Sequence, residues 1–169
     1  VAGRVRGKGA TVTGAMAETL AVRRARLGEE VGVSDWVLVD QARIQAFADA
    51  TLDQQWIHTD PERAAKGPFG GPIAHGLLSL SLLPYFAEQM DWAPTPRMSV
   101  NYGYEKVRFT APLPAGSRVR CRQTLDRVEE RPDGGLMLAT TCRLERDGDL
   151  MADGGRPVLV AEALGLFFY

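Results

Sequence analysis

The stretch IAHGLLSLSLLPYFAEQM, residues 73–90, decides the fold of this chain, because its pattern predicts the most buried helix of the protein. Its leucines, at positions 77, 78, 80, 82 and 83, fall on nearly the whole circumference of a helix, as in a helix buried on most sides. Gly76 is expected to open this helix directly after His75. Pro84 lies inside it and is expected to kink it or loosen one turn.

The chain after this helix changes to long runs that alternate or are rich in β-branched and aromatic residues. These runs predict strands at residues 97–109, 117–130, 135–146 and 157–169, separated by turns that contain Gly or Pro. Because the last three strands are joined by short connections, we expect them to form an antiparallel meander. The pattern predicts an α+β domain in which an antiparallel sheet wraps around a long central helix.

Two helix starts precede the central helix. Asp40 is a good N-cap for QARIQAFADAT, which predicts an amphipathic helix that ends at Thr51. Asp60 followed by Pro61 predicts the start of a second helix. Residues 53–59 are therefore a predicted connector between two helices. Before Asp40, we expect a moderately helical segment over residues 20–30 and a short strand or extended segment over residues 33–40.

Length and composition narrow the function classes. The 169 residues predict one domain over residues 19–169, after a small, basic and Gly-rich extension over residues 1–18 that we expect to be disordered. With 20 basic and 21 acidic residues, nothing in the overall charge favours a nucleic acid or membrane partner. Cys121 and Cys142 lie in predicted strands without zinc-site spacing, so we expect reduced thiols in a cytoplasmic protein.

Asp53 and His58 are the first candidates for chemistry. Residues five apart lie on different faces of a continuous helix, so these two side chains can meet only across a turn. Gln54, Gln55 and Trp56 lie between them and add more hydrogen-bonding capacity than a plain connector requires. Imidazole exchanges protons near neutral pH, and a carboxylate can activate the same water from another side. The alternative is that Asp53 and His58 form a polar pair that only satisfies the hydrogen bonding of its own members.

Gly76 and His75 are the candidates at the start of the predicted central helix. The first amides of a helix have no internal acceptor, so the Gly76 N–H can hold a developing oxyanion, although glycine there can equally serve tight packing. His75, with His58, Asp53 and Asp60, would complete a two-histidine carboxylate metal site. Because neither histidine belongs to an HxxxH or HxH pair, we expect no metal and a supporting role for His75.

Three motifs in order along the chain carry a resemblance to a known family. TLDQQWIHTDPERA, PIAHGLLSLSLL and NYGYEKVRFTAPLPAGSRV together resemble the MaoC-like dehydratases, the hot-dog-fold (R)-specific enoyl-CoA hydratases. The QWIH variant is similar to the nodulation-protein-N-like branch of that family. The resemblance covers residues 33–169.

The resemblance implies a hot-dog fold, a homodimer and no cofactor. It also implies hydration of a trans-2-enoyl-CoA, or another enoyl thioester such as one on an acyl carrier, to the (3R)-hydroxyacyl thioester, or the reverse dehydration. The family's catalytic Asp and His fall on Asp53 and His58, and its thioester-binding backbone amide falls on Gly76. Residues that we expect to contact the substrate are Gln55, Trp56, Lys66, His75, Asn101 and Arg108.

Particular reasons support the assignments that lie outside the catalytic motif. Lys66 and Arg108, with Arg118, are cations that can meet the phosphates of a CoA arm. Trp56 is large enough to narrow an acyl tunnel, or else packs in the core or the dimer. Asn101 can support Asp53, because this chain has Pro84 where family members can carry a helix serine.

One departure from the family pattern leaves an alternative open. Leu52 stands where the family commonly has Gly, and a leucine adopts a positive φ only at a cost, so we expect this loop to turn differently. A non-catalytic subunit that binds an acyl thioester, or serves as a partner, is therefore the alternative. An acyl-CoA thioesterase is less favoured, because the central helix carries only Glu88 as a carboxylate, near its far end.

Overall fold

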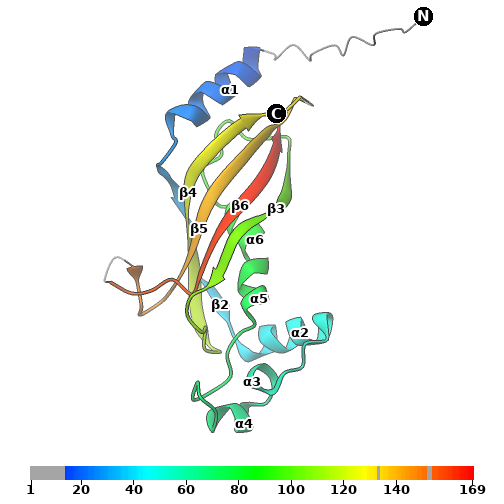
Figure 1. Ribbon diagram of the computed structural model, residues 1–169, viewed down its shortest axis with the longest axis vertical. Coiled ribbons are helices and arrows are strands. Elements are labelled where there is room, and N and C mark those ends of the chain that lie inside the picture. The colour runs from blue at the N-terminus through cyan, green and yellow to red at the C-terminus, as the bar shows by residue number, and fades with distance from the viewer. Residues whose placement is uncertain (1–13, 133, 152–153) are drawn as a thin grey trace, which may run out of the picture.

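A six-stranded antiparallel sheet forms the body of the molecule, with the strand order β1-β4-β5-β6-β3 and with β2 also paired to β4 (Figure 1). The computed structural model describes residues 14–132, 134–151 and 154–169. The strands are β1 (Glu30–Val33), β2 (Val37–Val39), β3 (Met98–Phe109), β4 (Ser117–Glu130), β5 (Leu136–Arg146) and β6 (Leu159–Phe168). The helices are α1 (Gly14–Ala25), α2 (Gln41–Thr51), α3 (Trp56–Thr59), α4 (Pro61–Ala65), α5 (Gly76–Ser81) and α6 (Leu83–Ala87).

The four long strands confirm the sequence prediction to within two residues at each end. The three strands β4, β5 and β6 pair in sequence order, so the predicted meander is also confirmed. Burial along β4 alternates at Val119, Cys121, Gln123 and Leu125, which are all less than 2 % exposed. Because this burial pattern repeats every two residues, one face of β4 points toward the core.

The predicted central helix is present as two short helices, α5 and α6, which meet at Leu82. Pro84 lies in the first turn of α6, where it has removed the continuous hydrogen bonding of one long helix, so the expected effect of this proline is confirmed. The prediction that this helix is buried on most sides is confirmed, because Leu78, Leu82 and Phe86 are each at most 8 % exposed. One stripe is open in this chain, with Leu77 58 % and Tyr85 52 % exposed.

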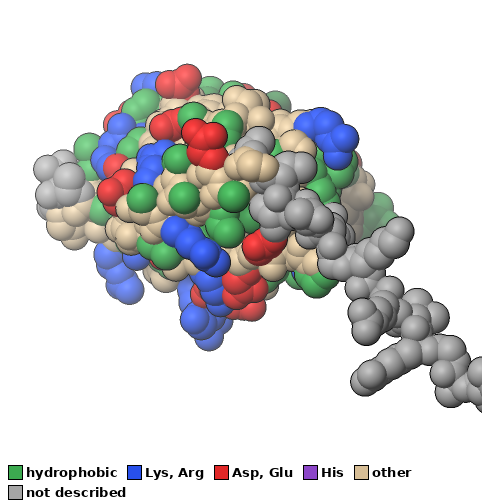
Figure 2. Space-filling view, turned by 90° about the horizontal axis from the view of Figure 1, so that it is seen from above, with side chains coloured by type: hydrophobic (Ala, Val, Ile, Leu, Met, Phe, Trp, Pro, Cys, Tyr) green, Lys and Arg blue, Asp and Glu red, His purple; other side chains and the backbone are tan. Residues whose placement is uncertain are grey.

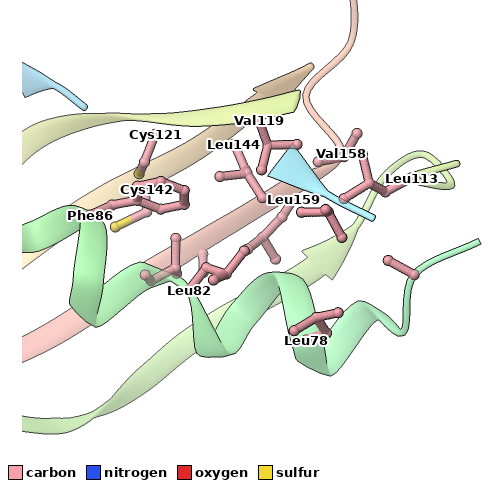
Figure 3. Close-up of a cluster of buried hydrophobic side chains, with 14 of the residues drawn as sticks. Leu78, Leu82, Phe86, Leu113, Val119, Cys121, Cys142, Leu144, Val158 and Leu159 are labelled. Atoms are coloured by element: carbon pink, nitrogen blue, oxygen red, sulfur yellow. The ribbon is translucent and has the colours of Figure 1, made fainter. Parts of the chain in front are cut away.

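The main core lies between these helices and the sheet (Figure 3). From the helix side, Leu82, Leu83 and Phe86 are buried. They meet buried side chains of β4, β5 and β6, namely Val119, Cys121, Cys142, Leu144, Leu159 and Ala161. Burying a side chain the size of Leu or Phe contributes roughly 1.5–3 kcal/mol, so this layer fixes the helices, and with them Gly76, against the sheet.

A second cluster lies at the opposite end of the sheet, under α1 (Figure 1). The helix predicted over residues 20–30 was wrong at both ends, because α1 spans Gly14–Ala25 and Glu30 already belongs to β1. Gly28 lies between them at φ 83, a conformation that ends the helix. Residues 1–13 of the expected disordered extension fall outside the described residues, and α1 begins within its last part.

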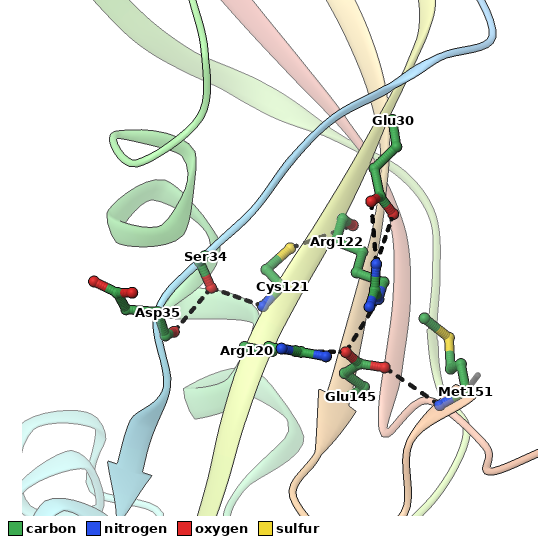
Figure 4. A network of polar contacts seen from close by, with 8 residues as sticks. All are labelled: Glu30, Ser34, Asp35, Arg120, Cys121, Arg122, Glu145 and Met151. Atoms are coloured by element: carbon green, nitrogen blue, oxygen red, sulfur yellow. Dashed lines mark hydrogen bonds and ion pairs between the residues drawn. The ribbon is translucent and has the colours of Figure 1, made fainter. Parts of the chain in front are cut away.

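A buried carboxylate ties β1, β4 and β5 together (Figure 4). Glu145 is fully buried on β5 and accepts hydrogen bonds from Arg120 Nε at 2.6 Å and Arg122 Nε at 3.0 Å on β4. Arg122 also binds both carboxylate oxygens of Glu30 on β1 at 3.1 Å. Because paired and hydrogen-bonded charges avoid the cost of an isolated buried ion, this network holds the strand register at that level.

The surface offers no concentrated charge on the face seen from above in Figure 2, where acidic and basic side chains are intermingled. This agrees with the nearly balanced composition of the chain. Among the described residues, no helix is both long enough and apolar enough to span a membrane.

Candidate active site

The bend between α2 and α3 positions the candidate carboxylate. Asp40 caps α2 by accepting a hydrogen bond from Arg43 N at 2.9 Å, as predicted, and α2 ends at Thr51. Leu52 then adopts the left-handed conformation with φ 63 and ψ 16. The expectation that leucine would make this loop turn differently was wrong: the residue takes the positive φ that glycine usually supplies. Its side chain is 84 % exposed, so the strain displaces no core contact.

His58 lies on α3, a one-turn helix within the connector that the sequence predicted without helical structure. Its side chain is only 7 % exposed, and its Nδ1 lies 2.7 Å from the Ile73 carbonyl oxygen. A carbonyl accepts only, so Nδ1 carries the proton and the neutral ring presents Nε2 as an acceptor. Burial lowers the pKa of His58 most, and the hydrogen bond to Ile73 opposes this only in part, which favours the neutral ring at pH 7.

His75 connects the bend that carries Asp53 to the start of α5. Its ring is 3 % exposed and stacks on the His58 ring, with centroids 3.8 Å apart and planes inclined by 26°. Its Nε2 donates to the Asp53 backbone carbonyl at 3.0 Å and lies 3.9 Å from Asp53 Oδ2. The Asp53 side chain is 54 % exposed, so the carboxylate stands at the open edge of a buried pair of imidazoles.

Gly76 begins α5 directly after His75, as predicted. As the first residue of the helix, it has an N–H without an acceptor inside the helix. A Cβ at this position would lie only 2.8 Å from the Phe109 ring, so the packing explanation for this glycine is supported as well. Only glycine allows Phe109, at the end of β3, to approach the helix start this closely.

One cavity, here called the site cavity, brings His58 and Gly76 together, whereas Asp53 and His75 are not among its lining residues. Its volume is ≈ 330 Å³, and both His58 and Gly76 line it. Its other walls are mainly apolar and come from Phe69, Ile73, Ser79, Phe109, Leu113 and Val158. Sequence reasoning missed Phe69, Ser79 and Phe109 as lining residues. Ser79 and Phe109 lie within the quoted motifs and Phe69 lies between two of them, but neither periodicity nor spacing shows which strand end reaches the start of a helix.

The other predicted substrate contacts lie apart from the site cavity. Trp56 packs against Gly67 and under the Arg63 guanidinium, 4.5 Å from the ring centroid, and does not line this cavity. Gln55 is exposed and caps α3 by its backbone, Lys66 is exposed at the end of α4, and Arg108 is exposed near the end of β3. Asn101 donates to the Tyr104 hydroxyl at 3.0 Å and lines a different cavity, so within one chain it does not support Asp53.

The donor set of a metal site is also present. One ligand atom each of Asp53, His58 and His75 lies within 4.8 Å of the other two. However, His58 Nδ1 is bonded to the Ile73 carbonyl, and His75 Nε2 is bonded to the Asp53 carbonyl. The arrangement therefore suits proton transfer better than coordination.

Known proteins share the sequence pattern and the fold of this chain. Residues 22–141 match the family described as MaoC like domain. The chain is 46 % identical over 147 residues to 3-hydroxyacyl-thioester dehydratase Z of Mycobacterium tuberculosis, covering 87 % of this chain and 94 % of that protein. It is 45 % identical to Nodulation protein N of Rhizobium leguminosarum bv. viciae, covering 81 % and 83 % of the two chains.

Solved structures show the same fold. The (R)-hydratase from A. caviae involved in PHA biosynthesis superposes with a TM-score of 0.64 at 24 % identity, covering 81 % of this chain and 95 % of that one. A MaoC-like dehydratase from Rhodospirillum rubrum gives a TM-score of 0.66 at 22 % identity, covering 84 % and 92 %. At these identities, the structural similarity shows that the chain has the hot-dog fold and nothing finer.

The fold and these comparisons together define the class as a hot-dog-fold hydro-lyase, an enzyme that adds water to its substrate or removes water from it. The chain belongs to the MaoC-like dehydratase family. Membership supports hydration or dehydration of an acyl thioester as its general reaction.

Proposed function

We propose that the protein hydrates a trans-2-enoyl thioester to the (3R)-hydroxyacyl thioester and catalyses the reverse dehydration. The observation that carries this proposal is the site cavity, which is lined by both the His58 imidazole and the first residue of α5, Gly76. A flat conjugated thioester needs these two functions on one side: a base for water and a donor for its carbonyl oxygen. The Asp53 carboxylate lies beside them, within 4.8 Å of a ring nitrogen of each histidine.

The proposed reaction begins with a water held between Asp53 and His58. His58 Nε2 takes a proton from this water, and the water oxygen bonds to carbon 3 of the substrate. The π electrons of the carbon–carbon double bond move toward the thioester, whose oxygen becomes enolate-like. The Gly76 N–H stabilises that oxygen, as a preorganised backbone donor does in other oxyanion sites. The proton that His58 took then reaches carbon 2 on the same face, either directly from His58 or after transfer to Asp53.

The state of His58 suits this role. The lowered pKa keeps the ring neutral at pH 7, so Nε2 can accept a proton at the start of the reaction. The bond to the Ile73 carbonyl fixes the tautomer, and the resulting imidazolium keeps that bond while it carries the proton. The carboxylate of Asp53 stabilises this charge. No cofactor is required, because thioester activation and water supply the chemistry.

The carrier of the acyl group is proposed to be coenzyme A or an acyl carrier protein, both of which end in a phosphate-bearing pantetheine arm. Lys66 and Arg108 are exposed and can meet the phosphates from the surface. The thioesterase alternative loses support, because Glu88 follows α6 and lines the other cavity rather than the site cavity. The non-catalytic alternative loses its main argument, because Leu52 adopts the left-handed turn.

We further propose that the protein is a homodimer joined through β3. Among the described strands, β3 pairs only with β6, which leaves its other edge open. Met98, Val100 and Tyr102 on this edge are each more than 40 % exposed, as are Leu77 and Tyr85 on the neighbouring helices. An open edge with apolar side chains invites pairing with a second copy. Light scattering after gel filtration should give twice the chain mass, whereas Val100→Lys should shift the protein toward the monomer.

The proposed reaction is tested with a short trans-2-enoyl-CoA. Loss of absorbance of the conjugated double bond reports hydration, and release of free thiol reports hydrolysis. We expect hydration without thiol release, and we expect Asp53→Asn and His58→Ala each to abolish it without loss of fold. Asp91→Asn is the matched control, because Asp91 is 62 % exposed and pairs with Arg26, which follows α1 and lies apart from the site. Unchanged turnover in both site variants would refute the site assignment, and binding without turnover would support the non-catalytic subunit.

A further inference from the structure

A second cavity, here called the far cavity, lies beside α6 and has a volume of ≈ 220 Å³. Small side chains create it: Ala87 on α6 faces Ala163 and Gly165 on β6, and all three line the space. Position 165 has no room for a larger residue, because a Cβ there would lie 2.7 Å from the Phe167 ring. The reaction described above does not use this space, since it shares no lining residue with the site cavity.

Most residues that line the far cavity are apolar, but a few polar side chains lie among them. Gln123 and Thr140 line it at 1 % and 6 % exposure, and the Tyr104 hydroxyl reaches it with its bond from Asn101. Gln123 Oε1 is buried and has no hydrogen-bond partner among the described residues. Native structures rarely leave a buried amide oxygen unpaired, so this position calls for a hydrogen-bonding group from a bound molecule.

The far cavity also lies at a useful distance from the candidate oxyanion donor. Gly76 and Pro84 are eight residues apart along α5 and α6, which corresponds to roughly 12 Å along a helix axis. An acyl chain that extends along these helices from a thioester at Gly76 therefore brings its tail to Pro84 and Ala87. A tail of about ten carbons is the right scale for that distance.

We propose that the far cavity selects acyl chains whose tail carries a hydroxyl group, which binds the Gln123 side-chain amide. The inference rests on the proposed function for the thioester anchor and adds the substrate class. A hydroxyl donates and accepts, so it satisfies either end of the amide. A plain alkyl tail would leave Gln123 Oε1 unpaired. A site built around a buried polar group discriminates strongly against a ligand that cannot bond to it.

The experiment compares the binding of decanoyl-CoA and 10-hydroxydecanoyl-CoA by titration calorimetry. Both ligands are saturated, so neither can be hydrated and affinity is measured without turnover. We expect the wild type to bind the hydroxylated ligand roughly tenfold more tightly, and Gln123→Met to reverse or abolish this preference. Thr124→Val is the matched control, because Thr124 is the next residue on β4 and points to the other face. It should keep the wild-type preference.

Equal affinity of the wild type for the two ligands overturns the proposal, whether or not any variant folds. An ordered water on Gln123 would produce that result, because either tail could leave it in place.

Ala87→Leu fills the far cavity from the helix side and should weaken the binding of both ligands. Unchanged binding would show that no tail enters the far cavity. The corresponding 2-enoyl thioesters separate the two ideas. Hydration of both at equal efficiency defeats only the hydroxyl preference, whereas a binding preference without hydration of either defeats only the proposed reaction.

Discussion

His75 stacks on His58 with ring centroids 3.8 Å apart, and the two rings come from different elements, the N-cap of α5 and the short helix α3. The stack joins the proposed base to the residue that precedes the proposed oxyanion donor. Because His75 Nε2 also holds the Asp53 carbonyl, one buried ring fixes the relative positions of all three proposed catalytic groups. His75 is therefore a positioning residue in the proposed reaction.

His75→Phe tests this role by keeping an aromatic ring while removing the donor to Asp53. We expect kcat for enoyl-CoA hydration to fall roughly 10- to 100-fold with little change in KM, because a small misplacement of the carboxylate bend is sufficient. The charge of His75 also contributes to the lowered pKa of His58, so the acid limb of the pH profile should move upward. Phe47→Leu is the control, since Phe47 contacts the His75 ring at 5.1 Å without a polar bond. An unchanged kcat would contradict the positioning role.

The pH dependence of the wild type follows from the lowered pKa of His58. The proposed base must be neutral, so kcat/KM should be constant near pH 7 and fall on acidification with an apparent pKa below 6.5, the ordinary value for histidine. The same shift couples to stability. Stability from this group is fully present above pH 6.5 and is lost as the pH falls through the lower folded pKa. An acid limb above pH 6.5 in kcat/KM would contradict the assignment of His58 as the base.

The sequence predicted the members of the site better than their arrangement. Spacing and the resemblance nominated Asp53, His58 and Gly76 as candidates, because the motifs that carry them are local in sequence. The stacking of His58 on His75 was not predictable, since it depends on how the turn at Leu52 is closed. Phe109 was missed as a wall of the site because its contact with Gly76 joins the end of β3 to the start of α5, and no local pattern encodes that distance.

Gly76→Ala should separate packing from chemistry at the helix start. Alanine keeps the N–H, but its Cβ would lie 2.8 Å from the Phe109 ring, so we expect a loss of roughly 1–3 kcal/mol in stability and a lower kcat. Phe109→Ala in the same chain should remove the clash and restore both quantities in part. A double-mutant cycle of urea unfolding and of kcat measures this coupling. Additive effects on both would show that Phe109 does not set the requirement for glycine.

Leu52→Gly should stabilise the protein. Leucine in the left-handed conformation costs about 1–2 kcal/mol, and the extra freedom of glycine in the unfolded chain offsets part of this, so we expect a net gain of about 0.5 kcal/mol. The exposed side chain gives up no packing. Ala50→Gly, also exposed but within α2, should instead lose about 1 kcal/mol. Urea unfolding midpoints compare the two, and a destabilised Leu52→Gly would mean that Leu52 makes a stabilising contact elsewhere.

The fold was largely predictable because periodicity carries it. Alternation along residues 117–130 and 135–146 identified strands that pair in sequence order, and Pro84 identified the break in the central helix. The parts that were not predicted depend on long-range contacts. Pairing of Glu30 with Thr124 turned the end of a predicted helix into a strand, and the open stripe at Leu77 and Tyr85 depends on what covers the molecule rather than on local pattern.

Glu145→Gln tests the buried network of Figure 4 independently of the site. The change leaves Arg120 and Arg122 without the carboxylate that both bind, so we expect a loss of about 3 kcal/mol in the free energy of unfolding.

Burial alone raises the pKa of Glu145, but the Arg120 hydrogen bond and the nearby charges lower it overall from 4.5. Its stabilisation is therefore present above pH 4.5 and lost as the pH falls through the lower folded pKa, so the variant should be less sensitive to acid between these values. Hydration per folded molecule should stay at the wild-type level, because Glu145 lines neither cavity. Urea unfolding at pH 7 and pH 4 checks the first two statements; equal stability of both proteins at pH 7 would show that the two arginines are satisfied without Glu145.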